Sequence, residues 1–359
     1  MKKILFITPY PKDVAPSQRL KFEQYYSAFE AAGYDISHDS FIDDEFWSFI
    51  YQEGNWSRKV LKTIRAYWSR FTLLFRLSRY DIIYIHLWYT PYGPPLFERV
   101  VTFLHKKVIY DIDDMVFLGH SSSANQLLMF LKGKNKMIAL MKKSTHVITC
   151  TPHLDAFVRK YNRNTTDISS TINTDTYVPV NTYEDVKPIT IGWSGSHSTA
   201  KYVYLLKEVL LEVYKKYKFK LLVIGDASFH IDGLDCEAIQ WVEASEVEDL
   251  QRIDIGIYPL PNEEWVLGKS GLKALQYMAL GIPTVASAIG ANYRVIENGA
   301  SGTLADSNEA WKDALEKYIL DPTLRKKHGL NARKRVEDLY SVKANESTYI
   351  EVIRTVTES

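Results

Sequence analysis

Short apolar runs that alternate with helix-like stretches constrain the fold of this chain more than any other feature. The first run, Lys3–Thr8, is continuous and leads into a proline-rich loop, which is typical of a strand buried on both faces of a parallel sheet. Gln18–Ala32 has helical spacing and is followed by Gly33, so we expect a helix that stops there. The pattern predicts further strands at Asp81–His86, Lys107–Asp111 and Thr145–Thr149. Strands that alternate with helices indicate a parallel, doubly wound sheet.

The same architecture recurs in the second half of the chain. The pattern blurs in the polar stretch Asn162–Asn181 and restarts after Pro188. It then predicts strands at Ile189–Gly192, Lys220–Gly225, Ile253–Tyr258 and Pro283–Ser287. A length of 359 residues suits two hydrophobic cores. We therefore predict an α/β chain of two Rossmann-like domains that face a cleft, 1–182 and 183–338, and a C-terminal helix, 339–359, that could pack back on the first domain.

Composition and charge exclude several classes of protein. Lys+Arg is 44 against Asp+Glu 43, so the chain lacks the global basic field of a dedicated nucleic-acid binder. Its apolar runs are shorter than the ~20 residues needed to span a bilayer. Cys150 and Cys236 suggest no disulfide framework or zinc site, and the first residues read as a strand rather than a signal peptide. We expect a cytoplasmic protein that binds no nucleic acid.

The first candidate for ligand binding is the segment Gly192–His197, which follows a predicted strand and precedes a helix-like run. Its small residues would let the backbone N–H groups of Ser194, Gly195 and Ser196 turn toward an anion at a helix N-terminus. The alternative is a plain strand-to-helix turn. The segment lacks the third glycine of the dinucleotide fingerprint, which argues against a nicotinamide dehydrogenase.

The second candidate is a predicted helix that begins near Gly268–Ser270 and stops at Gly281. Lys269 would lie in its first turn, where a cation is unfavourable beside the helix dipole unless an anion compensates it. Lys273 lies one turn further along the same face, so the two ammonium groups could flank a diphosphate. The alternative is a pair of solvated surface lysines.

A family resemblance starts from the stretch Leu275–Ser287, Leu-Gln-Tyr-Met-Ala-Leu-Gly-Ile-Pro-Thr-Val-Ala-Ser. Together with Gly290 and Val295–Gly302, it resembles the C-terminal half of retaining glycosyltransferases of family 4, which have the GT-B fold. The likeness extends from about Lys187 to Tyr340 and is weaker in the N-terminal half. It implies transfer of a sugar from a nucleoside diphosphate sugar, held by the C-terminal domain, to an acceptor held by the N-terminal domain, without a cofactor or a metal ion.

The resemblance also locates donor-binding residues, with departures. The family's pair of glutamates, eight residues apart, falls on Gly268 and Gln276, which indicates a divergent branch. The amide of Gln276 can still hydrogen-bond a ribose hydroxyl. The predicted donor-binding set is Ser194, Gly195, Ser196, Gly268, Lys269, Ser270, Lys273 and Gln276.

Three carboxylates, Asp111, Asp113 and Asp114, lie at the carboxyl end of a predicted strand, directly after Lys107–Tyr110. Asp113 lies about where many relatives of the resembled family carry a histidine. A carboxylate at this edge of the sheet could orient an acceptor hydroxyl, accept its proton or stabilise positive charge on the sugar. The alternative is that these residues cap the next helix or solvate the loop.

Three residues are predicted on the acceptor side. Ser17 and Arg19 could approach a substrate from the first loop, as the flexible first loop does in the resembled family; otherwise Ser17 caps the helix at Gln18 and Arg19 is exposed. His120 closes the loop that Asp111 begins and is a candidate acceptor contact.

The segment Trp56–Arg79 has its own pattern. Seven Lys/Arg and no acids lie between Glu53 and Asp81, and apolar residues recur there at intervals of three and four. This pattern predicts a basic amphipathic helix. The helix could bind the surface of an anionic membrane. Alternatively, its apolar face packs on the core of the first domain and its basic residues are solvated.

Together these features predict a glycosyltransferase at the inner face of the membrane, retaining in mechanism, that extends a surface glycan or a lipid-linked acceptor. Two alternatives remain open. One is a non-catalytic GT-B subunit that binds a nucleotide sugar or glycan, and the other is a sugar-nucleotide epimerase of the same fold.

Overall fold

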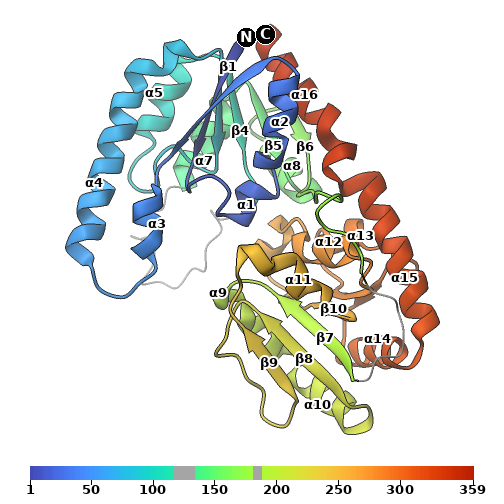
Figure 1. The fold of residues 1–359 in the computed structure, drawn as a ribbon. Helices are drawn as coiled ribbons and strands as arrows, with labels where there is room; N and C mark the ends of the chain where they lie inside the picture. Colours follow the sequence, from blue (N-terminus) through green and yellow to red (C-terminus); the bar gives the residue numbers. More distant parts are fainter. Residues whose placement is uncertain (116–133, 181–187) are drawn as a thin grey trace. The chain divides into compact units, whose positions relative to one another are not determined.

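The computed structural model describes residues 1–115, 134–180 and 188–359. The chain divides into two compact units (Figure 1). Unit 1 comprises residues 1–170 and 345–359, and unit 2 comprises residues 171–344. Each unit contains a six-stranded sheet in which every pair of neighbouring strands is parallel, with helices around it, so the prediction of two doubly wound domains is confirmed.

The sheet of unit 1 has the order β2-β1-β3-β4-β5-β6. Its strands are β1 (Lys2–Thr8), β2 (Tyr34–Ser40), β3 (Ile82–His86), β4 (Val108–Asp111), β5 (His146–Thr149) and β6 (Thr165–Asp167). Four of these, β1, β3, β4 and β5, were predicted from continuous apolar runs. They are central strands, which helices cover on both faces, so almost every side chain in them is buried.

The helices of unit 1 are shorter and more broken than the sequence suggests. They are α1 (Pro16–Arg19), η1 (Glu23–Tyr25), α2 (Tyr26–Ala31), α3 (Asp44–Ile50), α4 (Trp56–Leu73), η2 (Leu74–Arg79), α5 (Leu96–Leu104), α7 (Lys134–Lys143) and α8 (Pro152–Val158). The single helix predicted at 18–32 is three short segments. It does stop at Gly33, whose φ of +91° suits glycine.

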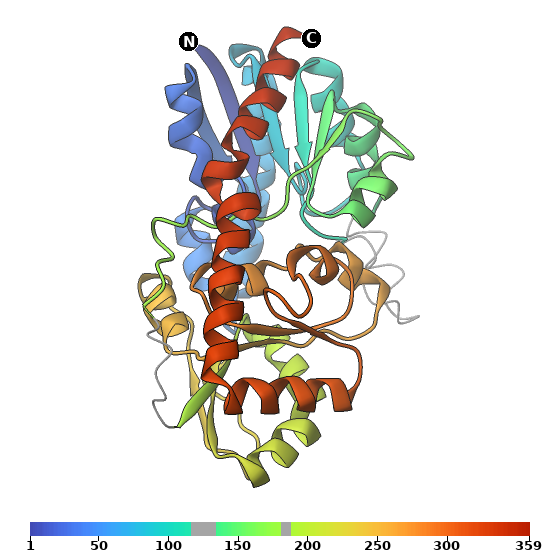
Figure 2. The ribbon, with the colours of Figure 1, turned by 90° about the vertical axis from the view of Figure 1, so that its right-hand side faces the viewer.

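The C-terminal helix α16 (Val342–Glu358) packs on the N-terminal unit, as predicted (Figure 2). Tyr349 is buried there, with its ring 4.5 Å from that of Tyr25 and close to Phe29. Lys107, which precedes β4, donates a hydrogen bond to the carbonyl of Thr357. The last turns of the chain therefore complete the first core.

The sheet of unit 2 has the order β12-β11-β10-β7-β8-β9. Its strands are β7 (Ile189–Ser194), β8 (Phe219–Ile224), β9 (Cys236–Ile239), β10 (Ile255–Tyr258), β11 (Thr284–Ser287) and β12 (Thr303–Ala305). Its helical segments are α9 (His197–Ala200), η5 (Lys201–Leu206), α10 (Lys207–Lys216), η6 (Glu243–Ser245), α11 (Glu246–Gln251), η7 (Glu264–Gly268), α12 (Leu272–Ala279), α13 (Asn292–Val295), α14 (Asn308–Leu320), α15 (Pro322–Arg335) and η8 (Val336–Tyr340).

The units divide at 170/171, twelve residues before the predicted boundary. Ile172 and Tyr177 are buried in the core of unit 2, and Ile172 pairs with Ser341. The polar stretch that was read as the end of the first domain thus supplies apolar anchors to the second. At the other end, residues 339–344 remain with unit 2.

Candidate donor and catalytic sites

The loop after β7 does not offer the backbone donors that its sequence suggests. The N–H of Ser194 donates to the hydroxyl of Tyr277 at 2.7 Å, and that of Gly195 donates to a carbonyl of β8 at 2.9 Å. The N–H of Ser196 donates to Oγ1 of Thr199 at 3.2 Å, in a capping box. All three amides therefore bond within the protein, which corrects the prediction that they turn toward an anion. A donor contact stays a prediction for the side-chain hydroxyl groups of Ser194 and Ser196.

Gly195 has a different function in this loop, because it leaves room for Lys273. A Cβ atom at position 195 would lie 2.7 Å from Cε of Lys273 and 2.4 Å from the indole ring of Trp193. Any larger residue would push the lysine aside. The ammonium of Lys273 lies 5.5 Å from the centre of the Trp193 ring.

Lys273, rather than Lys269, lies in the first turn of helix α12. The helix begins at Leu272, after Gly271 with φ +80°, so Lys269 precedes it, and the prediction of a helix start near 268–270 is wrong. Burial and the neighbouring charge of Lys269 lower the pKa of Lys273 to about 8. Among the described residues, Lys273 has no ion pair with a carboxylate. Two adjacent cations at such a position would be stabilised by a bound anion.

Gln276 belongs to a buried polar network. Its amide nitrogen donates to the Tyr177 hydroxyl at 3.0 Å and to Glu246 at 3.1 Å. Glu246 also accepts from Tyr177 at 2.8 Å and from the Trp241 indole at 3.0 Å. The predicted ribose contact would therefore have to use the amide oxygen of Gln276. Glu246 and Tyr177 were missed because both lie far from position 276 in the sequence.

The remaining donor-site candidates lie just before α12. Gly268 is buried at the end of η7, and Ser270 is half-buried in the link to the helix. The ammonium of Lys269 lies 5.3 Å from the ring centre of Trp265, which in turn lies against Tyr202. The structure thus brings Gly195, Lys269 and Lys273 together beside aromatic rings.

Asp111 is the centre of a buried ion cluster in unit 1. Its carboxylate lies 2.6 Å from the ammonium of Lys21 and 3.1 Å from Nδ1 of His86. All three side chains are buried. Burial by itself would raise the pKa of Asp111, but Lys21 and His86 outweigh it and lower that pKa below its ordinary value. Asp111 therefore acts as an internal counter-ion at the end of β4.

The other two predicted catalytic carboxylates differ from Asp111. Asp113 is half-buried, and burial raises its pKa above the ordinary value despite opposing effects of His86 and Lys21. A raised pKa favours proton exchange nearer neutral pH. Asp114 accepts a hydrogen bond from the N–H of the adjacent Met115 at 2.7 Å.

Two of the acceptor-side candidates, Ser17 and Arg19, lie in helix α1. Ser17 lies inside α1, whose N-cap is Ala15, so it is not the helix cap that the alternative proposed. Arg19 lines a pocket of about 490 Å³ together with Glu23 and His38. His120 lies outside the described residues.

The described ranges, 1–115, 134–180 and 188–359, lack two further features. No group of three or more His, Cys, Asp or Glu side chains there is arranged to hold a metal ion. No helix in these ranges has the length and hydrophobicity needed to cross a membrane.

Comparisons with known proteins place this geometry in context. Residues 188–321 match the family model described as glycosyl transferases group 1. No curated protein matches the chain. Among solved structures, sucrose-phosphate synthase from Thermosynechococcus elongatus is similar with a TM-score of 0.71 at 17% identity, with 100% of each chain covered.

Two further structures support the same fold. HepE from Anabaena in complex with UDP has a TM-score of 0.67 at 15% identity, covering 99% of this chain and 100% of that chain. The lipopolysaccharide outer core galactosyltransferase WaaB has a TM-score of 0.65 at 14% identity, covering 98% and 99%. At these identities the likeness establishes the fold, which is GT-B. Residues 188–321 thus resemble the glycosyl transferases group 1 family, within a chain that has the GT-B fold.

Proposed function

We propose that unit 2 holds a nucleoside diphosphate sugar and that the chain transfers its sugar, with retention, to a glycan or lipid-linked acceptor of a surface polysaccharide. The observation that carries the proposal is Lys273, a half-buried cation with a second cation beside it and no carboxylate partner in the described part of the chain. Solved structures of HepE, a protein of the same fold, contain UDP and UDP-glucose. WaaB, a lipopolysaccharide galactosyltransferase, supports the acceptor class by analogy.

In this proposal the reaction is driven by electrostatics at the leaving group. When the bond between sugar and diphosphate breaks, negative charge accumulates on the diphosphate, and the ammonium groups of Lys269 and Lys273 stabilise it. The side chain of Gln276 positions the nucleoside by hydrogen bonding a ribose hydroxyl. Asp113, with its raised pKa, accepts the proton of the acceptor hydroxyl.

A panel of nucleotide sugars tests the proposal. Calorimetric titration with UDP, GDP and their sugars should yield binding for at least one base, and the matching sugar should be transferred to an acceptor extract. Lys269→Ala should weaken nucleotide binding, whereas Asp113→Asn should lower kcat with little change in nucleotide affinity. NMR of the product should show the anomeric configuration of the donor. Binding without any turnover would support a non-catalytic subunit, and sugar conversion without acceptor would support an epimerase.

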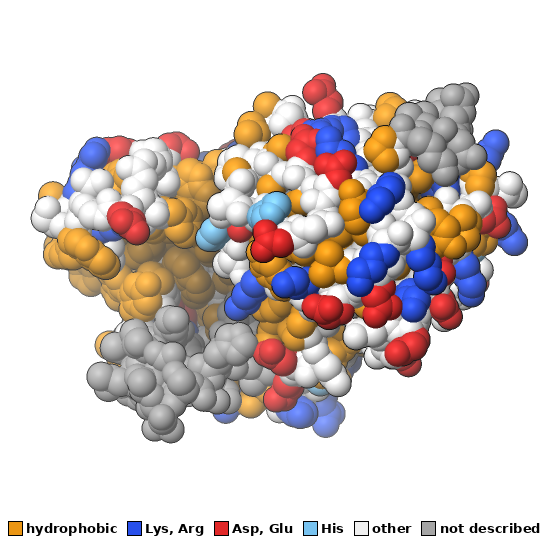
Figure 3. All heavy atoms as spheres, turned by 90° about the horizontal axis from the view of Figure 1, so that it is seen from below, with side chains coloured by type: hydrophobic (Ala, Val, Ile, Leu, Met, Phe, Trp, Pro, Cys, Tyr) orange, Lys and Arg blue, Asp and Glu red, His pale blue; other side chains and the backbone are white. Residues whose placement is uncertain are grey.

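We also propose that α4 rests on an anionic membrane surface. An apolar stripe on this helix, Trp56, Val60, Ile64, Trp68 and Phe71, is exposed, and Phe75 continues it on η2. Tyr67 and Leu73 on this helix pack inward, as does Leu77 on η2. Viewed from below, hydrophobic side chains gather over the end of unit 1 that carries α3 and α4, at the left of Figure 3. Packing against the core of unit 1 therefore does not explain why these exposed positions carry apolar side chains.

The cations of this segment are only partly available to lipid. Arg58 pairs with Glu45 at 2.7 Å, Lys62 pairs with Asp43 at 2.9 Å, and Arg70 is buried against Asp39. The exposed apolar stripe, rather than the charge, therefore supports association most directly. The variant Ile64→Ser/Trp68→Ser should release the protein from vesicles in a co-sedimentation assay, and equal sedimentation of both proteins would contradict the proposal.

A further inference from the structure

We propose that the groove between α5 and α7 binds the phosphate of an anionic phospholipid at the bilayer surface. The inference rests on the proposed membrane association of α4 and deepens it, because it adds a specific headgroup site. The site lies on different helices from the basic segment that the sequence singled out.

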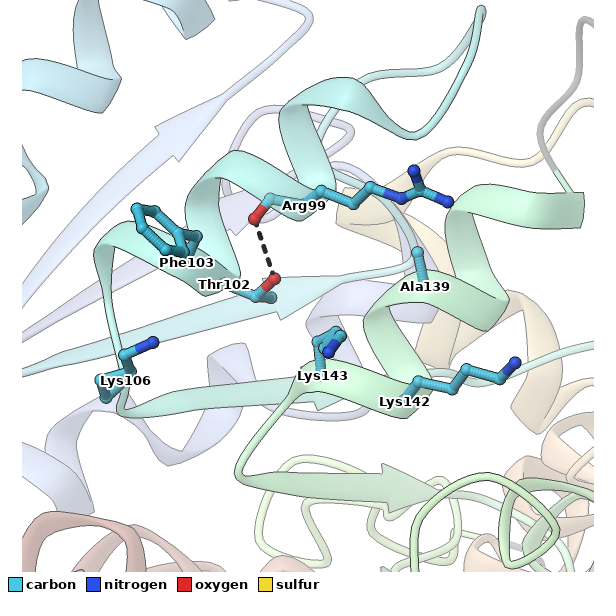
Figure 4. Close-up of a pocket in the computed structure, with 7 residues that line it drawn as sticks. All are labelled: Arg99, Thr102, Phe103, Lys106, Ala139, Lys142 and Lys143. Carbon is cyan, nitrogen blue, oxygen red and sulfur yellow. Dashed lines mark hydrogen bonds between the residues drawn. The ribbon is translucent and has the colours of Figure 1, made fainter.

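The groove is a pocket of about 390 Å³ whose charged lining is entirely cationic. Arg99 comes from α5, Lys106 from the loop after it, and Lys142 and Lys143 from the last turn of α7 (Figure 4). Within the described part of the chain, none of these four residues forms an ion pair with a carboxylate. Phosphate oxygens are suitable partners for Lys and Arg donors, and Arg can bind them in a bidentate manner.

A buried ion pair fixes the two helices that form the groove. Glu98 on α5 lies 3.4 Å from the ammonium of Lys136 on α7, and both side chains are buried. Glu98 also accepts hydrogen bonds from the N–H and hydroxyl of Thr90, each at 3.1 Å. The acid nearest to Arg99 in the sequence is therefore committed to the interior. This buried pair helps to set the spacing of the two helices, and the charged side chains that line the groove outside are all cations.

Exposed apolar side chains beside the groove favour a lipid over a free phosphate ion. Phe103 lines the pocket and is 75% exposed, with the Lys106 ammonium 5.3 Å from its ring centre. Leu96 and Leu104 on α5 are also more than half exposed. α5 also packs against η2, the segment that follows α4 and carries the exposed Phe75. Cations next to apolar side chains suit the boundary between headgroups and acyl chains.

The test compares binding to two kinds of vesicle, phosphatidylcholine alone and phosphatidylcholine with phosphatidylglycerol. The pocket variant is Arg99→Gln/Lys142→Gln. The matched control is Lys160→Gln/Arg163→Gln, which removes two exposed cations from the same unit. All four substituted positions are exposed, so the thermal unfolding midpoints of both variants should agree with that of the unaltered protein.

The pocket variant should lose affinity for anionic vesicles by about 25-fold, since each cation near such a surface contributes about fivefold. Its weak binding to neutral vesicles should not change, and the control should lose much less. An equal loss of affinity in both variants would contradict a phosphate site in the groove, but it would not contradict membrane association. If the unaltered protein binds neither kind of vesicle, both the proposed membrane association and the lipid site in the groove are wrong.

A second measurement separates a lipid from a free anion. Inorganic phosphate should leave the thermal unfolding midpoint of the protein unchanged at constant ionic strength. Stabilisation of the unaltered protein and the control, but not of the pocket variant, would identify a site for a free phosphate and overturn the lipid assignment.

Discussion

Two charge clusters in this protein, one in each unit, differ in whether a buried cation is paired with a carboxylate. In unit 1, Lys21 and Asp111 are buried together 2.6 Å apart, with His86 as a third partner. In unit 2, Lys273 lies beside another cation, and its pKa falls to about 8. The first cluster contains its own counter-charge and is complete within the fold. In the second, Lys273 forms no ion pair with a carboxylate in the described part of the chain, which suits a ligand that supplies negative charge.

The largest expected effect comes from breaking the complete cluster. Asp111→Ala leaves the ammonium of Lys21 buried without its carboxylate, so the free energy of unfolding should fall by about 3–5 kcal/mol. Urea denaturation followed by circular dichroism measures this. The double variant Lys21→Met/Asp111→Leu should recover most of the loss, because it removes both charges. A single variant as stable as the unaltered protein would mean that the pair contributes nothing to folding.

The same kind of change in unit 2 should act on binding instead of on folding. Lys273→Met removes a charge-assisted contact to the diphosphate and should weaken nucleotide binding by about 1.5–3 kcal/mol, or roughly 10- to 100-fold. Its free energy of unfolding should not fall, since a charge that burial disfavours has been removed. Calorimetric titration and urea denaturation provide the two readouts. Lys326→Met, an exposed site on α15, is the control. If Lys273→Met lowered the free energy of unfolding and left nucleotide affinity unchanged, Lys273 would be a structural residue and the contrast between the two clusters would be wrong.

The smallest effect is a pH dependence that distinguishes the clusters. Because the pKa of Lys273 is lowered to about 8, the unliganded site loses its proton as pH rises through that value. Nucleotide affinity should then fall by up to about tenfold per pH unit above 8. Lys273→Arg should abolish this decline, since its guanidinium stays charged. An identical pH profile for both proteins would assign the titration to another group.

The sequence located the central strands of both sheets and missed the edge strands. The strands β2, β6, β9 and β12 end their sheets, and most of their side chains are only half-buried. A strand packed on both faces must be continuously apolar, whereas an edge strand can be polar and still pair. β6 lies in the stretch where the apolar pattern blurred. The periodicity therefore revealed the number of sheets, but not their width.

The candidate donor site was predictable in part for a similar reason. Lys269 and Lys273 are only four residues apart, so their proximity was predictable even though Lys269 precedes α12 instead of lying in it. The partners of Gln276 and Asp111 were not predictable, because Glu246 and Lys21 are 30 and 90 residues away from them. The backbone donors after β7 were misjudged, since their acceptors on β8 and α12 are set by packing between elements.

The sequence by itself determined that this chain forms two parallel sheets, and that cations gather before and within one short helix. Both follow from local rules, because burial selects apolar runs and residues four apart in the sequence stay close in space. Only the tertiary structure decided which charges are neutralised. It also decided which apolar side of α4 faces solvent, because both sides of that helix carry apolar residues and only packing against neighbours selects between them.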